Sequence, residues 1–401
     1  METGNGKKKT NAPPLRFPGF RGEWEERNLS DFVTENKERN IKGYFDKTNV
    51  LSVSGDYGIV NQIELLGRSF AGTRVSQYRV VRHGNIVYTK SPLKEYPYGI
   101  VKANMGDDGI VSTLYAVYKV NGNADEKFIQ YYFSLSSRIN KYFKPIVRIG
   151  AKHDMKIGNQ EVLANRVVFP SLSEQRKIAD FLRLLDERIA VQRALIGEMG
   201  RLMKGLNDYL NTKADKEFVL GDIGVFIRGL TFSNNDISDD GVCVLRSVNI
   251  QNTSYANYTD NIIYVNKSIT PEQELRKGDI VICMANGSAS LVGKNSVYEG
   301  NYSGRITVGA FCGIFRSSNR IARWLLQTSY YRGAVCRLKQ GGNGAISNIN
   351  GEDLMRLHFK SLQDSRVYYV LDLLSEKLNV LRMQLFKYQK QKEYFLQKMF
   401  L

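Results

Sequence analysis

The hydrophobic positions along the chain form two kinds of pattern. In 178–210 and again in 367–399, apolar residues recur at alternating steps of four and three, the spacing of a helix that packs lengthwise against another helix. Both stripes hold for about five heptads, so each predicts a helix roughly 50 Å long. Elsewhere the apolar runs are short, rich in Val, Ile, Tyr and Phe, and bounded by Gly, Asn and Asp. Such runs predict strands joined by hairpin turns; they include 84–88, 111–120, 278–283 and 309–315, with short helices around 128–137 and 321–331.

The two long stripes predict a seam between helices rather than a catalytic site. The first consists of Ile178, Leu182, Leu185, Ile189, Gln192, Ile196, Met199, Met203, Leu206 and Leu210. The second consists of Val367, Leu371, Leu374, Leu378, Leu381, Leu385, Tyr388, Lys392, Phe395 and Met399. Gln192 and Lys392 interrupt the two stripes, and Ser171 to Glu174 forms a capping-box pattern that predicts the start of the first helix.

The second half of the chain repeats the first. Glu187-Arg188-Ile189 is matched by Glu376-Lys377-Leu378, displaced by 189 residues. Farther upstream, 82–87 resembles 276–281, and 29–32 resembles 220–223. The repeating unit is therefore a globular domain followed by a long helix.

Connectivity predicts the relative direction of the two helices. The second domain begins just after the first helix and finishes just before the second helix, and domain termini usually lie close together. The helices should therefore be antiparallel. The predicted fold class is α+β, with two pseudo-symmetric α/β domains separated by a long antiparallel two-helix coiled coil. The expected segments are a leader (1–20), the first domain (21–170), the first helix (171–212), the second domain (217–360) and the second helix (361–401).

Composition adds a partner class to this picture. At 401 residues the chain is long enough for two or three domains. Lys and Arg number 57 against 40 Asp and Glu, a net charge of +17, which favours a polyanion such as nucleic acid. The chain shows no secretory signal and no apolar run long enough for a membrane span, so a cytoplasmic location is expected. Cys243, Cys283, Cys312 and Cys336 form no metal-ligand spacing and are interpreted as reduced packing residues.

Candidate catalytic motifs are weak. No glycine-rich S-adenosylmethionine loop follows a predicted strand, and the Pro13-Pro14 pair lacks the aromatic residue that stacks a flipped base. Gly287 to Lys294 has five residues between its glycines instead of four, and Asn295 stands where a phosphate loop carries Ser or Thr. Glu35-Asn36-Lys37 has nuclease-like spacing without a partner acid, and we interpret it as a solvated surface turn. We expect a binding protein without a metal or cofactor of its own.

Two local sequences carry a resemblance to a known family. Pro14 to Phe20 followed by Trp24, and Phe169 to Ile178 with its Pro170 and Glu174-Gln175, are similar to the opening and the pre-helix signature of type I restriction-modification specificity subunits. Together with the repeat and the twin stripes, the resemblance covers nearly the whole chain. The second copy, 359–366, departs from the signature because it lacks the proline and the Glu-Gln pair.

The resemblance implies a role in reading DNA. In this family two target-recognition domains each read one half of a bipartite, asymmetric site in double-stranded DNA, and the helices set the spacer. Two adenine methylase (M) subunits and two restriction (R) subunits join the specificity subunit, which is not itself an enzyme. S-adenosylmethionine, ATP and Mg are then expected only in those partners. Two other interpretations stay open: the DNA-recognition part of a fused restriction-methylase, and a coiled-coil scaffold without DNA specificity.

Base-reading side chains are expected among polar and basic residues of the loops, because Arg, Asn and Gln match base edges while Lys more often contacts phosphate. In the first domain the candidates are Tyr57, Arg68, Arg74, Lys90, Lys94, Arg148, Lys152 and His153. In the second domain they are Arg228, Thr231, Arg246, Asn249, Asn286, Ser288, Lys294, Arg305, Lys339, Gln340 and Asn343. The glycine-rich segment 339–344 is the best of these loops, since glycines let a backbone approach DNA closely.

Overall fold

The computed structural model describes residues 11–72, 74–93, 96–149, 155–250, 256–257, 261–339, 346–362 and 364–401. The chain divides into two compact units. Unit 1 contains Met1–Ala190 with Phe386–Leu401, and unit 2 contains Val191–Leu385. Each long helix therefore contributes one part to each unit.

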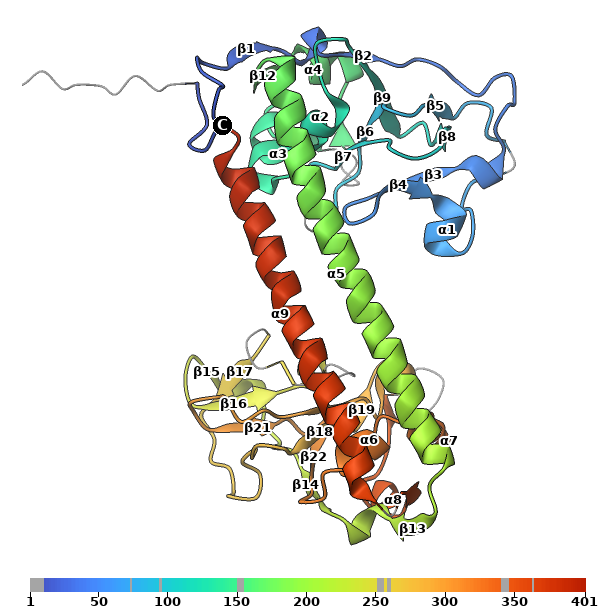
Figure 1. Ribbon diagram of the computed structural model, residues 1–401, viewed down its shortest axis with the longest axis vertical. Helices are drawn as coiled ribbons and strands as arrows, with labels where there is room; N and C mark the ends of the chain where they lie inside the picture. The colour runs from blue at the N-terminus through green and yellow to red at the C-terminus, as the bar shows by residue number, and fades with distance from the viewer. Residues whose placement is uncertain are drawn as a thin grey trace, which may run out of the picture. The chain divides into compact units, whose positions relative to one another are not determined.

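Unit 1 is built on a four-stranded antiparallel sheet in the order β2 (Val33–Glu35), β9 (Tyr115–Val120), β6 (Ile86–Thr89) and β7 (Val101–Ala103). Unit 1 also has separate two-stranded pairs, of which Figure 1 labels β1 (Glu25–Asn28) with β12 (Arg166–Phe169), β3 (Leu51–Ser54) with β4 (Gly58–Asn61), and β5 (Arg79–Val81) with β8 (Gly109–Val111). A further pair is β10 (Arg148–Ile149) with β11 (Met155–Lys156). Its short helices are η1 (Leu29–Asp31), η2 (Lys47–Asn49), α1 (Gln62–Leu66), α2 (Glu126–Tyr132), α3 (Ser136–Phe143) and α4 (Asn159–Ala164).

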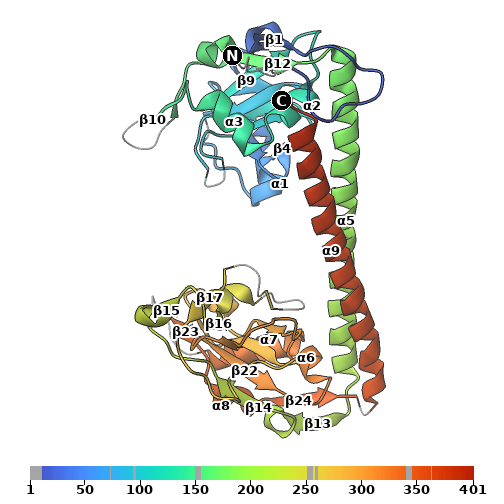
Figure 2. The same ribbon diagram turned by 90° about the vertical axis from the view of Figure 1, so that its left-hand side faces the viewer.

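Unit 2 contains a sheet of the same design, in the order β14 (Val225–Arg228), β22 (Cys312–Arg316), β18 (Ile280–Cys283) and β20 (Asn295–Val297). A second sheet has the order β15 (Ile237–Ser238), β17 (Ile263–Val265), β16 (Val242–Leu245) and β21 (Ile306–Val308) (Figure 2), and β16 and β21 are parallel. The remaining strands pair as β13 (Lys216–Val219) with β24 (His358–Ser361) and β19 (Ala285–Asn286) with β23 (Ser347–Asn348). The short helices are η3 (Leu220–Asp222), η4 (Asn234–Asp236), η5 (Ser247–Asn249), η6 (Ala289–Leu291), α6 (Ala322–Leu325), α7 (Ser329–Leu338), α8 (Gly351–Met355) and η7 (Ser365–Tyr368).

The structure confirms the repeat. In both main sheets, the strand that comes first in the sequence lies at one edge, the last strand lies beside it, and the second and third strands follow. The matched sequences 82–87 and 276–281 lead into β6 and β18. The first and last strands of each domain also pair with each other, β1 with β12 and β13 with β24. The lobes outside the main sheets differ, because unit 1 has separate two-stranded pairs where unit 2 has a second four-stranded sheet. The common sheet is therefore a frame on which each unit carries a different lobe.

The two predicted long helices are α5 (Leu172–Thr212) and α9 (Tyr369–Lys398). In unit 1 the ring of Phe181 contacts that of Phe395, with centroids 4.8 Å apart, and the guanidinium of Arg188 lies 3.9 Å from the ring centroid of Tyr388. Residue numbers rise along one helix as they fall along the other, so the two segments are antiparallel. The mixed helix and strand fold expected from the sequence is confirmed.

Most seam positions are enclosed. Buried seam residues are Ile178, Leu182, Leu185, Ile189, Gln192, Met203, Leu210, Leu371, Leu378, Leu381 and Met399. The other seam residues are half-buried: Ile196, Met199, Leu206, Val367, Leu374, Leu385, Tyr388, Lys392 and Phe395. The first stripe and the end of α9 share one core in unit 1 with Trp24, Phe128 and Phe169 of the globular domain, so helix and domain are held by the same packing.

The two polar interruptions each have partners within their own unit. In unit 2, Gln192 donates through Nε2 to the backbone oxygen of Leu381 at 2.8 Å. In unit 1, the Lys392 ammonium pairs with Asp186, which also accepts a hydrogen bond of 2.7 Å from the hydroxyl of Tyr131 on α2. Neither polar side chain is left unsatisfied in the seam, which removes most of the cost of burying it.

The start of α5 differs from the capping box that the sequence predicts. The Glu174 carboxylate does not turn back to the helix start. It forms a bidentate ion pair with the Arg16 guanidinium, with both N–O distances at 2.6 Å, and Glu174 is buried. The predicted helix start is confirmed, since α5 begins at Leu172, but the Glu174 carboxylate is satisfied by a guanidinium instead of by a backbone amide at the helix start.

The ion pair between Arg16 and Glu174 also joins the two sequences that resemble the family, 14–20 and 169–178. Phe17 packs edge-on against Phe181, with centroids 5.6 Å apart. Gln175, fully buried, donates to the backbone oxygens of Pro170 and Asn123 and accepts from the amide of Asp125. The opening segment and the pre-helix signature are therefore two halves of one contact.

The second helix begins later than the sequence indicates. Ser361, the expected first residue, still belongs to β24 and pairs with Lys216. Asp364 then caps η7, and α9 starts at Tyr369. The missing proline and Glu-Gln pair leave this junction with a strand end and a 3-10 turn in place of a direct helix start.

Arg138 closes the far end of α9. Its guanidinium donates to the backbone oxygens of Tyr132, Leu396 and Leu401 and lies 4.9 Å from the ring centroid of Phe400. Burial lowers the pKa of Arg138 to about 10. The charge is retained at neutral pH, and it satisfies carbonyl groups that a helix terminus leaves without partners.

We expect Leu185→Asp to lower the melting temperature of the chain by roughly 5 °C or more, because an unpaired carboxylate in an apolar core costs several kcal/mol. Leu185 is 8% exposed in the core of unit 1, whereas its neighbour Leu184 is 56% exposed. Leu184→Asp is therefore the matched control and should leave the melting temperature nearly unchanged. Equal melting temperatures for the two variants, measured by differential scanning fluorimetry, would contradict the buried seam.

Candidate nucleic-acid interface

One group of predicted DNA-contact residues comes together in unit 2. Asn286 donates through Nδ2 to the Ser247 hydroxyl at 3.1 Å and accepts through Oδ1 from the amide of Ser288. Lys339, at the end of α7, donates to the backbone oxygen of Ala289 at 2.8 Å. Arg246 precedes Ser247 in the same turn. We call Arg246, Ser247, Asn286, Ser288 and Lys339 the unit 2 loop cluster.

Pairing of β19 with β23 supports the loop cluster. Asn286 lies opposite Ser347, so the described residues on either side of 340–345 both lie at this cluster. Arg332, on α7, adds a hydrogen bond of 3.2 Å to the backbone oxygen of Ser290. The loops therefore rest on a sheet and a helix, which position polar side chains more precisely than a free loop does.

The charges of the loop cluster are not neutralised by carboxylates within the described part of the chain. Arg246 donates to the backbone oxygen of Asn261, and the hydrogen bonds of Arg332 and Lys339 also go to backbone oxygens. A carbonyl oxygen satisfies a donor but does not cancel a positive charge. These side chains therefore create a local positive field that favours phosphate.

Other unit 2 candidates have internal roles. Asn249 is buried, with 1% of its surface exposed, and its Oδ1 accepts from the amide of Arg246. Arg305 forms an ion pair of 3.1 Å with Glu274. Arg228 and Thr231 accept through their backbone oxygens from the side chains of Gln273 and Lys267. Lys294 is half-buried beside the loop cluster, where its amide donates to the backbone oxygen of Leu291 and its own backbone oxygen accepts from the amide of Cys283.

In unit 1, Tyr57, Arg68 and Arg74 belong to an exposed lobe that contains β3, β4 and α1. Tyr57, in the β3–β4 turn, is 68% exposed, and the Arg68 guanidinium lies 4.6 Å from the ring centroid of Phe70. Exposed rings and cations at one lobe suit contacts with bases and phosphates. The sequence prediction missed the exposed Tyr44 and Phe70, whose signal was an aromatic residue in a polar loop with a basic neighbour.

Lys90 and Arg148 each contact a residue in the first turn of α4. The Lys90 ammonium donates to the Asn159 side chain at 2.5 Å and to the backbone oxygen of Ile157, and burial lowers its pKa. Arg148 lies 3.4 Å from Glu161. Lys90 has internal partners and is therefore less available to DNA than Arg68 and Arg74, whereas the Arg148 side chain is 82% exposed despite its contact with Glu161.

Lys94, Lys152, His153, Gln340 and Asn343 lie outside the described residues. The predicted glycine-rich segment 339–344 is thus represented by Lys339 alone.

Two interpretations of the sequence are corrected here. Glu35 is not in a solvated turn: its side chain is 10% exposed and lies 3.4 Å from the Arg79 guanidinium, while Asn36 is buried and donates to the backbone oxygen of Val80. This segment ends strand β2 and faces internal partners.

Of the four free cysteines, Cys243, Cys283 and Cys312 are buried, but Cys336 is exposed on α7 and is not a packing residue.

The described residues contain no group of three or more His, Cys, Asp or Glu side chains placed to hold a metal ion. Burial raises the pKa values of Cys243, Cys283 and Cys312, which disfavours a reactive thiolate at these positions. Among the described helices, none combines the length and apolar character needed to cross a membrane.

Known proteins match this chain in part or over its whole fold. The family model of the type I restriction modification DNA specificity domain matches residues 21–199. The type I restriction enzyme StySPI specificity subunit of Salmonella potsdam is 32% identical over 171 residues, and the EcoKI specificity subunit of Escherichia coli (strain K12) is 30% identical over 170 residues. Each match covers 40% of this chain and 34% of the relative, so the chain spans about a third of the length of these relatives.

The crystal structure of the type I restriction-modification system S subunit from M. genitalium aligns with 97% of this chain and 99% of its own. The TM-score is 0.54 at 15% identity, which shows a shared fold. The family model and the two relatives confirm the resemblance found in the sequence over the part of the chain that they match.

We expect the double substitution Arg246→Gln and Lys339→Gln to weaken binding to duplex DNA of any sequence. Each lost phosphate contact should reduce the slope of log affinity against log salt by about 0.9. Arg305→Gln is the control, because the Arg305 charge is already paired with Glu274 at 3.1 Å. Fluorescence anisotropy across a KCl series measures the slope. An unchanged slope in the double variant, or an equal loss in Arg305→Gln, would remove the loop cluster from the interface.

Proposed function

We propose that the chain is the sequence-reading subunit of a type I restriction-modification enzyme, since residues 21–199 match the family model of the type I restriction modification DNA specificity domain. The observation that carries the proposal is the repeated main sheet with two different lobes. In this proposal each lobe reads one half of a bipartite site. Because the lobes differ in structure and sequence, the two half-sites differ as well, and the target is asymmetric.

The loop cluster of unit 2 and the aromatic and cationic lobe of unit 1 supply the DNA contacts in this proposal. Arg and Asn side chains can read guanine and adenine edges in the major groove, while Lys339 and the other uncompensated cations bind phosphate. The buried Asn249 and the paired Arg305 shape and support the loops. In this proposal, the side chains that read bases are therefore distinct from the cations that bind phosphate.

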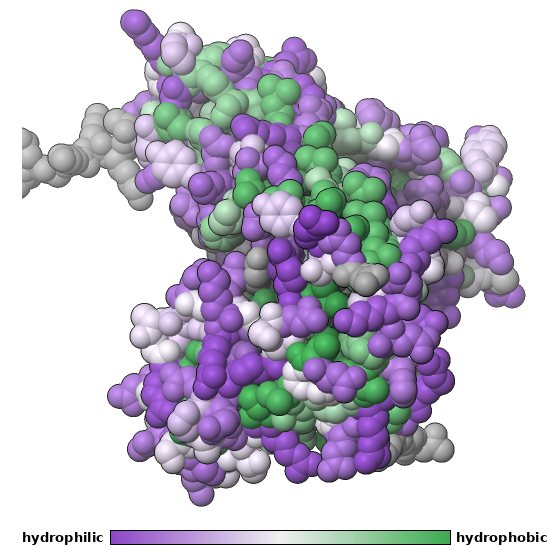
Figure 3. Space-filling view, turned by 60° about the horizontal axis from the view of Figure 1, so that its bottom comes forward, coloured by the Kyte–Doolittle hydropathy of each residue, from purple (hydrophilic) through white to green (hydrophobic). Residues whose placement is uncertain are grey.

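A second apolar stripe on α5 supports a partner-binding role. In unit 2, Val191, Leu195, Leu202 and Tyr209 recur at steps of four and seven, and they are 68%, 45%, 60% and 57% exposed. The exposed apolar residues of α9 are Tyr369, Val370, Leu373, Val380, Met383, Phe386 and Tyr394. Figure 3 shows that hydrophobic side chains reach the surface among hydrophilic ones. An exposed stripe of heptad spacing is typical of a face that packs against further helices.

We assign this stripe to the methylase subunits. Their catalytic work requires S-adenosylmethionine, and the restriction subunits bring ATP and Mg, so the specificity subunit itself needs no cofactor. A repeated frame offers two similar docking faces, which suits two copies of one methylase.

Modularity tests the DNA-reading role. We expect replacement of 218–358 by the equivalent domain of another specificity subunit to change one half of the methylated sequence and keep the other half and the spacer. The exchange boundary is favourable because Phe218 and Phe359 are paired across β13 and β24. Methylome sequencing of cells that carry the chimera gives the readout. If both half-sites change together, the two domains are not independent readers.

The stripe is tested with Val191→Asp and Ala190→Asp. Val191 is on the stripe, and Ala190 is an exposed neighbour that points about 100° away around the helix. We expect Val191→Asp to reduce co-purification of methylase subunits at least tenfold, since a carboxylate would be buried in an apolar contact. Ala190→Asp should retain the complex, and both variants should keep their melting temperatures. Normal complex formation by Val191→Asp would exclude this face as the docking surface.

A further inference from the structure

Each unit carries an exposed apolar side chain in a tight turn that leads into its main sheet. In unit 1 the turn is 112–115, and its third residue, Leu114, is 64% exposed. In unit 2 the turn is 309–312, and its third residue, Phe311, is 61% exposed. Both turns are closed by a hydrogen bond from the amide of the fourth residue to the backbone oxygen of the first, at 3.0 Å in unit 1 and 2.8 Å in unit 2. We call 112–115 and 309–312 the apolar turns.

Strand register shows that the two apolar turns are equivalent. In unit 1, Tyr115 begins β9 and lies opposite the last residue of β6. In unit 2, Cys312 begins β22 and lies opposite the last residue of β18. Leu114 and Phe311 are the residues immediately before these two pairs. The chain therefore has a large, exposed apolar side chain at the same position of both copies, although the lobes around that position differ.

In unit 2 the apolar turn is attached to two parts of the loop cluster. The backbone oxygen of Phe311 accepts from the amides of the two residues that precede Asn286, at 2.8 and 3.1 Å. At the other end of the turn, the Gly309 amide donates at 2.9 Å to the backbone oxygen of the residue that precedes Arg246. Phe311 is therefore held beside both Asn286 and Arg246, which belong to the proposed DNA contacts.

In unit 1 the apolar turn adjoins the lobe that carries Tyr57. Tyr115, the residue after Leu114, packs against the same core cluster as Val53 of β3, and Ile59 of β4 is part of that cluster. These two strands form the hairpin with Tyr57 in its turn. An exposed apolar side chain thus accompanies the proposed DNA contacts in each unit.

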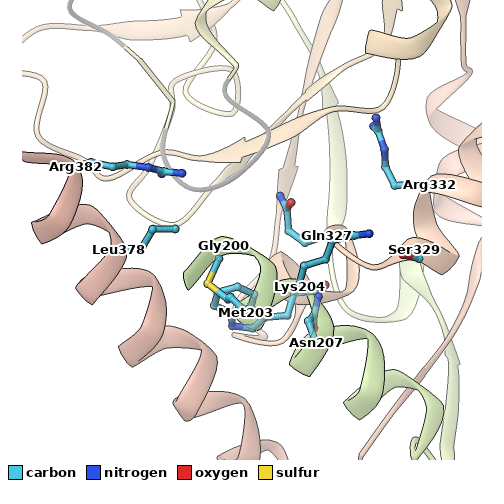
Figure 4. A pocket seen from close by; sticks show the side chains of 10 residues that line it. Gly200, Met203, Lys204, Asn207, Gln327, Ser329, Arg332, Leu378 and Arg382 are labelled. Carbon is cyan, nitrogen blue, oxygen red and sulfur yellow. Dashed lines mark hydrogen bonds between the residues drawn. The ribbon is translucent and has the colours of Figure 1, made fainter. Parts of the chain in front are cut away.

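The main cavity of unit 2 does not account for Phe311. Met203 and Asn207 of α5 and Leu378 of α9 line this cavity (Figure 4), and Phe311 is not among its lining residues. Single exposed apolar side chains are common on protein surfaces. Recurrence at one position of two copies with different lobes, beside polar and cationic residues in both, instead favours a shared contact outside the chain.

The 5-methyl group of thymine fits both the position and the recurrence of these side chains. In the proposed function the loops read base edges in the major groove, and the thymine methyl is the apolar group that base pairs present there. Adenine methylases act on both half-sites, so two half-sites of different sequence still share an A·T pair. A polar base contact is expected to differ between the two copies, whereas an apolar side chain present in both matches the pair that both half-sites contain.

We propose, as a step that rests on the proposed function, that Leu114 and Phe311 each contact the methyl group of the thymine that pairs with the methylated adenine of their own half-site. The uncompensated cations of the loop cluster bind phosphate and hold the duplex, while the apolar tip distinguishes this base pair from others. A polar substituent at the 5-position, or none, loses the contact.

Uracil in place of this thymine removes only the methyl group and tests the contact. The duplexes carry the sequence found by methylome sequencing, and fluorescence anisotropy measures their binding to the full chain. We expect uracil opposite the methylated adenine to weaken binding about fourfold, the effect of one methyl-sized group withdrawn from an apolar contact. Uracil in the spacer is the control and should leave the affinity unchanged.

A comparison with a scrambled duplex separates the two levels of the proposal. If the chain prefers its target to the scrambled duplex but binds the thymine and uracil targets equally, the methyl contact is overturned and the proposed function stands. If the chain shows no preference for its target, the proposed function fails, and the methyl contact fails with it.

Two variants assign the contact to single side chains. Phe311→Ala should bind thymine and uracil equally in the half-site of unit 2 and keep the difference in the other half-site, and Leu114→Ala should show the reverse. Val225→Ala is the matched control, because Val225 is 56% exposed and pairs with Arg316, at the opposite end of β22 from Phe311. It should discriminate like the unsubstituted chain, and melting temperatures verify that all three variants fold.

The same variants expose a different occupant of the apolar turns. Discrimination against uracil that survives in folded Phe311→Ala would overturn the assignment. If that variant also fails to co-purify with methylase subunits, the turn is a protein-binding surface and not a reader of thymine.

Discussion

The shared packing of the two long helices is the constraint on which both units depend. In unit 1, Ile178, Leu182 and Leu185 of α5 lie in one core with Met399 and Phe400 from the end of α9 and with the aromatic residues of the globular domain. In unit 2, Leu210 and Leu371 belong in the same way to one core with Tyr331 and Phe359. Neither helix is an added linker. Removing either would open the interior of both units.

Periodicity predicted the helices and the repeat because both arise from regular spacing. Steps of four and three placed the seam, and sequence matches displaced by 189 to 194 residues related the two helices and the two main sheets. The partners of single polar residues could not be predicted in this way. Glu174 fits a capping box by spacing, but its partner, Arg16, lies 158 residues earlier, and only tertiary structure brings such groups together.

The candidate interface shows the same limit. Residue type identified Arg246, Asn286 and Lys339, and the structure brings them into one cluster. Residue type also identified Asn249 and Arg305, which are a buried turn residue and the partner of Glu274. A side chain suited to a base edge is equally suited to a backbone amide or a carboxylate. Sequence alone does not reveal which of these partners is within reach.

Protein synthesis runs from the N-terminus, and the core of unit 1 includes Leu396, Met399 and Phe400. These residues leave the ribosome after every residue of unit 2, which ends at Leu385. The first domain to be translated must therefore hold an unfilled apolar surface beside Trp24 and Phe128 while the second domain is made. Unit 2 can close earlier, since all its core residues precede that point. The second domain can therefore complete its core before the first domain, although the first domain is translated earlier. Aggregation or chaperone binding is most favoured while the first domain still lacks the end of α9.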